Sequence, residues 1–202
     1  GDVVPMASIT KLVTALMVLD EMPLTVGESG PSFTFDEDDQ ETYYDYLAED
    51  ESALDVPVDG SLSQYQMLQG MLIGSAGNYA DRLASTIWPT DTVFAKAARA
   101  WLDRKNLPGI TVVEPTGIDP ANAADPASLI TLARLAVADP VIAEIVRTPA
   151  VDLPGAGQVV NTNDLLTDWG PRTEDDANVY AALAKSRTVL YTPSVLTTPR
   201  TL

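Results

Sequence analysis

The stretch from Pro5 to Leu19 constrains the fold most, because it is apolar apart from three hydroxyl side chains and one lysine. The leucines at positions 12, 16 and 19 recur at helical spacing, so the pattern predicts a helix that begins after Pro5. Ser8 falls in the first turn of this helix and Lys11 follows three residues later. This spacing places the hydroxyl and the amine on one face, about 5–6 Å apart at Cβ.

Two interpretations of this pair are open from the residues alone. In the first, Ser8 is an N-cap whose hydroxyl accepts a backbone hydrogen bond, and Lys11 lies in solvent. In the second, the lysine amine takes the proton of the serine and makes it a nucleophile, which requires burial or nearby cations to lower the lysine pKa. The apolar setting favours the second, because no Lys or Arg stands between residues 12 and 72.

The composition limits the possible chemistry. The chain has no cysteine and no histidine, which excludes disulfides, thiolate catalysis, Ser-His-Asp triads and zinc sites built from those residues. A serine nucleophile in this chain would therefore need Lys, Glu or Asp as its base. The net charge of −17 argues against partners such as nucleic acid or an anionic membrane surface.

Acidic residues are concentrated in one part of the sequence. Residues 36–59 hold eleven Asp and Glu and no Lys or Arg. This segment lacks the spacing of a calcium-binding loop, so we expect a solvated acidic face on a helix that begins near Asp36.

A second candidate for chemistry lies between two predicted helices. Ser63 and Gln66 have the spacing of a capping box, and the helix they open ends at a glycine-rich break over residues 74–78. A further helix is expected from about residue 79 to residue 88. Ser75 and Asn78 would then bring a hydroxyl and an amide to the interior, although a plain interhelical turn is the alternative.

Three stretches together resemble one known family, the serine D-alanyl-D-alanine carboxypeptidases, which are low-molecular-weight penicillin-binding proteins, here of the actinobacterial type. Residues 5–15 resemble the active-site helix of the family, and residues 71–84 resemble its second motif, Ser-x-Asn. Residues 114–119 resemble the family's Gly-Leu/Ile-Asp turn, which lies near the site. The resemblance covers roughly residues 1–170 and implies an α+β fold of the β-lactamase/transpeptidase type, mainly its helical lobe with an incomplete antiparallel sheet. Residues 171–202 do not resemble the family and are expected to form a divergent tail.

The resemblance implies a role for each candidate residue. Ser8 would attack the carbonyl between two D-alanines of a peptidoglycan stem peptide, with Lys11 as general base, and β-lactam antibiotics would be trapped as an ester on the same hydroxyl. Ser75 would pass a proton to the leaving D-alanine. If that serine is aligned with the motif serine, Gly77 takes the third place of the motif, so Asn78 is the nearest amide that could bind the substrate.

The resemblance implies no metal or cofactor. It also implies an extracytoplasmic location, in a secreted or cell-envelope protein. The chain itself shows no signal peptide and opens without a start methionine, so we expect a processed or truncated product.

The third family motif, Lys-Thr-Gly, is absent from the sequence. The nearest string is residues 185–187, in which Arg187 stands where the glycine is needed. We therefore expect activity to be weak or lost. Two alternatives stay open: a non-catalytic acidic helical interaction module, and a β-lactamase, which would need a deacylating glutamate that the sequence does not place.

Overall fold

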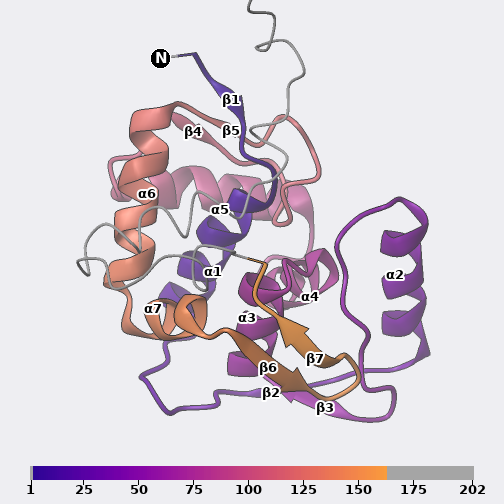
Figure 1. Cartoon of the computed structure of the whole chain (residues 1–202). Helices are drawn as coiled ribbons and strands as arrows, with labels where there is room; N and C mark the ends of the chain where they lie inside the picture. The colour runs from indigo at the N-terminus through magenta and orange to yellow at the C-terminus, as the bar shows by residue number, and fades with distance from the viewer. Residues whose placement is uncertain (1, 163–202) are drawn as a thin grey trace, which may run out of the picture.

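A computed structural model describes residues 2–162 of the chain (Figure 1). Helices predominate among its elements, and the strands are short. In chain order the elements are β1 (Val4–Pro5), a 3-10 turn η1 (Ala7–Ile9), α1 (Thr10–Glu21), β2 (Ser32–Thr34), α2 (Glu37–Ala48), β3 (Ser61–Ser63), α3 (Gln64–Ile73), α4 (Gly77–Ile87), α5 (Asp91–Arg104), β4 (Ile110–Thr111), β5 (Ala123–Ala124), α6 (Pro126–Ala138), α7 (Pro140–Arg147), β6 (Ala150–Leu153) and β7 (Gly157–Val160).

Helix α1 lies at the centre of the molecule, where α3, α4, α5 and α6 contact it (Figure 1). Every side chain from Thr10 to Leu19 is buried. A helix covered on all sides has to be apolar on all sides, which explains the composition of this stretch. Helical structure begins after Pro5 as predicted, but residues 7–9 form a 3-10 turn, in which Ala7 has a φ of +46°, and the α-helix starts only at Thr10.

The strands form small antiparallel sheets. In the three-stranded sheet, β5 lies between β1 and β4, and Ala124 is paired with both Val4 and Ile110. The N–H of Met6 then donates to the carbonyl of Asn122 at 2.7 Å, which ties the start of the chain to the loop that precedes β5. Strand β2 pairs with β3, and β6 forms a hairpin with β7. The predicted α+β fold, mainly helical with an incomplete antiparallel sheet, is confirmed.

Side chains cap the starts of several helices. Ser63 and Gln66 form the predicted capping box at the start of α3, and the Asp125 side chain accepts from Ser128 N at the start of α6. Helix α4 begins at Gly77, two residues earlier than predicted. Its first N–H donates to the carbonyl of Ser52 at 2.7 Å, and no side chain caps this helix start.

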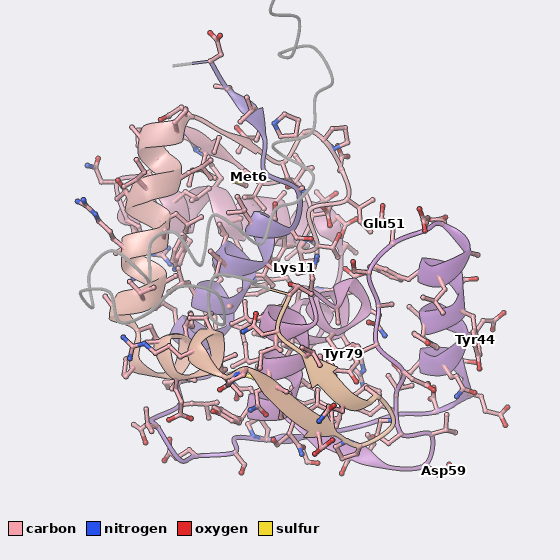
Figure 2. The ribbon with its side chains drawn as sticks, in the orientation of Figure 1. Met6, Lys11, Tyr44, Glu51, Asp59 and Tyr79 are labelled. Carbon is pink, nitrogen blue, oxygen red and sulfur yellow. The ribbon has the colours of Figure 1, made fainter. Side chains whose placement is uncertain are left out.

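Helix α2 stands apart from the body at one side of the molecule (Figure 1). None of its residues is buried, and its first turn carries three acidic side chains, which confirms the predicted solvated acidic face. Its inner side is attached to α4 by an ion pair between Asp39 and Arg82 at 3.3 Å and by a hydrogen bond from Tyr46 to Asp81. Tyr44 lies on the outer side, away from the body (Figure 2).

The predicted tail over residues 171–202 lies outside the described residues. The domain boundary near residue 170 therefore stays a prediction. None of the helices within residues 2–162 combines the length and apolar character that crossing a membrane requires.

Candidate active site

Three polar side chains from separate elements meet at the start of α1. The Lys11 amine donates to Ser8 Oγ at 3.2 Å, and the Ser75 hydroxyl donates to the same oxygen at 2.9 Å. Ser8 lies in η1, Lys11 in the first turn of α1, and Ser75 in the turn between α3 and α4. The alternative in which Ser8 caps the helix is wrong, because neither η1 nor α1 has a side-chain cap.

The backbone is strained beside both hydroxyls. Ser75 has a φ of +61°, and Ala7, next to Ser8, has a φ of +46°. A non-glycine residue in this region costs of order 1–3 kcal/mol, which the surrounding structure must offset. Such residues cluster at functional sites, where strain fixes a side chain in a useful direction. Here it fixes two hydroxyls within hydrogen-bond distance of each other.

Lys11 is a buried base. Only 4% of the residue is exposed, and its amine also donates to the Thr116 carbonyl at 2.7 Å. Burial lowers the pKa of Lys11 from 10.5 to about 8, although three carboxylates, those of Glu114, Glu51 and Asp81, favour the ammonium form. With that pKa, about one molecule in ten carries a neutral amine at pH 7. The lowered lysine pKa on which the nucleophile interpretation depends is therefore present.

Asn78 does not present a free amide to this cluster. Its Oδ1 accepts from Leu54 N at 3.1 Å and its Nδ2 donates to Leu54 O at 2.7 Å, so both polar atoms bind the main chain. Gly77 offers no side chain, and a Cβ placed there would lie 2.4 Å from a ring carbon of Tyr46. In this conformation each polar atom of the Asn78 amide therefore has one hydrogen bond to the main chain, and Gly77 has no side chain to contribute.

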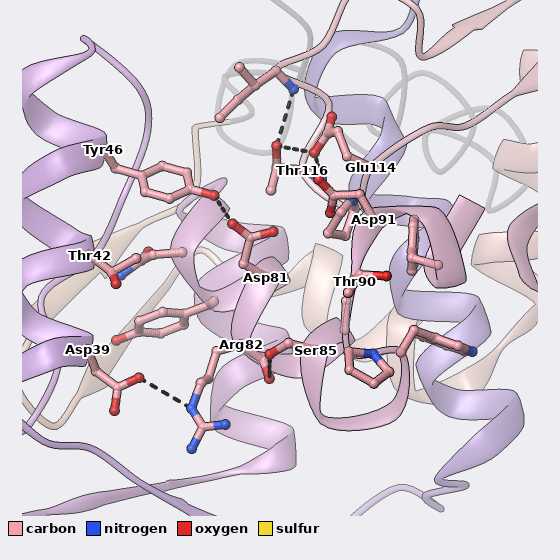
Figure 3. A pocket seen from close by; sticks show the side chains of 18 of the residues that line it. Asp39, Thr42, Tyr46, Asp81, Arg82, Ser85, Thr90, Asp91, Glu114 and Thr116 are labelled. Atoms are coloured by element: carbon pink, nitrogen blue, oxygen red, sulfur yellow. Dashed lines mark hydrogen bonds and ion pairs between the residues drawn. The ribbon is translucent and has the colours of Figure 1, made fainter. Parts of the chain in front are cut away.

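A cleft lies beside the cluster, between α2, α4, the start of α5 and the loop of residues 114–120 (Figure 3). It has a volume of about 770 Å³. Tyr46 reaches from α2 to Asp81 on α4 across it, and burial raises the pKa of Asp81 to about 6 against the effect of that hydrogen bond. Glu114 and Thr116 line the cleft and also face Lys11, so the cleft meets the cluster at this loop.

A much smaller cavity of about 20 Å³ touches the reactive groups directly. It is lined by Ser8, Lys11 and Ser75 together with apolar side chains, and its volume suffices for one water molecule. Within residues 2–162 no three acidic side chains converge closely enough to hold a metal ion.

Glu114 is a site residue to which the sequence analysis gave no role. Its carboxylate accepts hydrogen bonds from the residues that follow it, and its charge acts on Lys11. The sequence does contain a local signal for this contact. Glu114 precedes Thr116 by two residues and Gly117 by three, and a carboxylate at that spacing can accept hydrogen bonds from their N–H groups.

Comparison with known proteins supports the fold. No protein-family model matches the chain, and no curated protein matches it either. Among solved structures, a D-alanyl-D-alanine carboxypeptidase from Mycobacterium tuberculosis is 23% identical, with a TM-score of 0.69 over 84% of this chain and 61% of that one. A penicillin-binding protein homologue from the same organism is also 23% identical, with a TM-score of 0.70 over 84% and 62% of the two chains. The DD-transpeptidase of Streptomyces K15 is 21% identical, with a TM-score of 0.70 over 83% and 68%.

The chain spans about three-fifths of the length of the two mycobacterial structures. At this level of identity the likeness concerns the fold. The described residues therefore adopt the penicillin-binding-protein, or β-lactamase-like, fold and contain mainly its helical part.

Proposed function

We propose that the chain is a serine-type DD-peptidase, more narrowly a D-alanyl-D-alanine carboxypeptidase of the low-molecular-weight actinobacterial type. One observation carries this proposal: the buried Lys11 amine, with its pKa near 8, lies between Ser8 Oγ at 3.2 Å and the Thr116 carbonyl at 2.7 Å. A base poised near neutral pH and in contact with a hydroxyl is what nucleophilic catalysis by serine requires. The fold is also that of solved DD-peptidases.

In the proposed reaction, Ser8 Oγ attacks the carbonyl between the last two D-alanines of a stem peptide while Lys11 takes the hydroxyl proton. Backbone N–H groups, one of them from Ser8, stabilise the oxyanion. The C–N bond then breaks, and the Ser75 hydroxyl passes a proton to the leaving amine of D-alanine and regains one from Lys11. Water attacks the acyl-serine ester, which releases the shortened peptide and restores Ser8.

The same proposal names the partners and the place of the protein. Peptidoglycan stem peptides are the substrate, and β-lactam antibiotics acylate Ser8 and remain there as slowly hydrolysed esters. The protein acts outside the cytoplasm, as a secreted or envelope protein. Asn78 has a smaller part than the family motif implies, because Leu54 already binds both polar atoms of its amide.

Turnover is expected to be weak. The sequence holds no Lys-Thr-Gly string, whose lysine would bind the substrate carboxylate. Loss of one preorganised donor in an active site slows catalysis by about 10²–10³-fold, and loss of the motif removes several such contacts. Acylation by a strained β-lactam is less demanding than peptide cleavage, so it is the better test.

The test is labelling of the folded protein with a fluorescent penicillin, followed by denaturation and electrophoresis. We expect covalent label on the wild type, none on Ser8→Ala, and full label on Ser32→Ala, a control with the same change at an exposed serine of β2. A folded wild type without label, or equal label on Ser8→Ala, contradicts the proposal. The first of these results would favour the non-catalytic acidic module, whose exposed surface is α2.

A further inference from the structure

Glu114 is surrounded by hydrogen-bond donors from the loop that it begins. Its Oε2 accepts from the N and Oγ1 atoms of Thr116, each at 2.6 Å. Its Oε1 accepts from the N of Gly117 at 2.7 Å, from the N of Asp119 at 3.3 Å, and from the Asn122 side chain. Both oxygens are occupied, so this carboxylate is poorly placed to activate a water molecule. The glutamate that a β-lactamase would need is therefore not Glu114.

The loop that Glu114 organises contacts α1 at successive residues. The Thr116 carbonyl accepts from the Lys11 amine, and the Pro115 carbonyl accepts from Thr14 Oγ1, each at 2.7 Å. Gly117 follows with a φ of +90°, and a Cβ there would lie 1.9 Å from a main-chain oxygen of η1. The position of the Thr116 carbonyl, and with it the direction of the amine, thus depends on the shape of this loop.

Glu114 also acts on Lys11 through its charge. Three carboxylates influence the amine: Glu114 from this loop, Glu51 from the segment after α2 (Figure 2), and Asp81 from α4. Each raises the pKa of Lys11 against the lowering effect of burial, and Glu114 does so most strongly. One side chain therefore bears on both the geometry and the protonation of the base.

We propose that Glu114 is a positioning residue, which holds the Thr116 carbonyl against the Lys11 amine and so aims that amine at Ser8. The inference rests on the proposed function, because it assigns Lys11 as the base. Glu114 acts through its neighbours and has no contact with Ser8 in the hydrogen-bond network. It sets where the amine lies and the pH at which the amine becomes able to accept a proton.

The test compares the rate of Ser8 acylation by a fluorescent penicillin from pH 6 to pH 10 in four proteins. The wild type should reach its plateau with a midpoint near pH 8. Glu114→Gln removes the charge, so its midpoint should fall by roughly half a pH unit or more and its plateau by about tenfold. Glu114→Asp keeps the charge on a shorter side chain, so only its plateau should fall. Glu37→Gln makes the same substitution at an exposed position in the first turn of α2 and should match the wild type.

A purely structural role for Glu114 would lower the melting temperature and leave the midpoint of the pH profile in place. An unchanged midpoint in folded Glu114→Gln overturns the inference. If that variant does not fold, Glu114→Asp decides: an unchanged plateau overturns the inference, and a reduced plateau with the wild-type midpoint supports it.

Failure of the proposed function can be told apart from failure of this inference. The pKa of Lys11 can be measured without acylation, from the ¹³Cε chemical shift of isotopically labelled lysine, with Lys11→Arg to assign the signal. If the wild type takes no label, the proposed function fails, while a lower Lys11 pKa in Glu114→Gln still supports the electrostatic link between the two residues. An equal Lys11 pKa in both proteins refutes that link.

Discussion

Replacing Lys11 with methionine should stabilise the protein while it abolishes acylation. Methionine has a similar length and fills the same buried space without a charge. Burial lowers the pKa of Lys11 from 10.5 to about 8, and at about 1.4 kcal/mol per unit the buried ammonium costs about 3 kcal/mol at pH 7. The substitution also removes the hydrogen bonds to Ser8 and Thr116, at about 1 kcal/mol each. The variant should therefore be more stable than the wild type by about 1 kcal/mol at pH 7.

The pH dependence of this difference identifies its cause. Between pH 8 and pH 10.5 the unfolded chain binds a proton at Lys11 that the folded chain has lost. Wild-type stability therefore rises relative to Lys11→Met over this window, by about 3 kcal/mol in full. The advantage of the variant should disappear and then reverse. The other titrating groups are present in both proteins, and the Asp81 carboxyl, whose pKa the charge of Lys11 lowers, titrates near pH 6, below this window.

The assay is urea unfolding of both proteins from pH 6.5 to pH 10, with Lys96→Met as the control. Lys96 lies on the exposed face of α5, so the same substitution there should change stability by no more than about 0.5 kcal/mol. The reasoning is refuted if the difference between the wild type and Lys11→Met does not change with pH. It is also refuted if Lys11→Met is the less stable protein at pH 7 by several kcal/mol.

Three further substitutions test the packing around the cluster. Gly77→Ala places a Cβ 2.4 Å from the Tyr46 ring and should cost about 1–3 kcal/mol in chemical denaturation, a cost that a second substitution, Tyr46→Ala, should largely remove. Asp81→Asn should gain about 2 kcal/mol of stability relative to the wild type as the pH rises from 4 to 6, because folding raises the pKa of Asp81 from 3.8 to about 6. Urea unfolding of both proteins at several pH values measures this difference, and a difference that does not change with pH contradicts the prediction. Gly117→Ala meets the Ala7 carbonyl at 1.9 Å with a φ of +90°, so it should lower stability by more than about 2 kcal/mol and slow penicillin labelling; unchanged melting and labelling would contradict this packing.

The local parts of this structure could be predicted from the sequence. The three-residue spacing of Ser8 and Lys11 predicts their contact, which is present at 3.2 Å. The capping box of Ser63 and Gln66 likewise depends on residues three apart, and it is present. The 3-10 form of the first turn, residues 7–9, could not be predicted, because periodicity cannot distinguish an α-helical turn from a 3-10 turn that begins at a residue with positive φ.

The rest of the site depends on contacts between residues far apart in the chain. Lys11 bonds to Thr116 across 105 positions, and Ser75 bonds to Ser8 across 67. The spacing of residues does not reveal such pairs, and the approach of Ser75 to Ser8 was expected only from the family resemblance. For the same reason the sequence could not show that Leu54 binds the amide of Asn78.

The most direct test of the central claim is to locate the acyl group after reaction with penicillin. Trypsin should release residues 1–11 as one peptide, in which Ser8 is the only serine. Mass spectrometry of this peptide should show the added mass of one intact penicillin. Lys11→Met lacks this cleavage site, so it is digested with another protease, and its peptide that contains Ser8 should carry no added mass. If the folded wild type carries no such adduct, or carries it on a different peptide, then Ser8 and Lys11 do not form a nucleophile and its base.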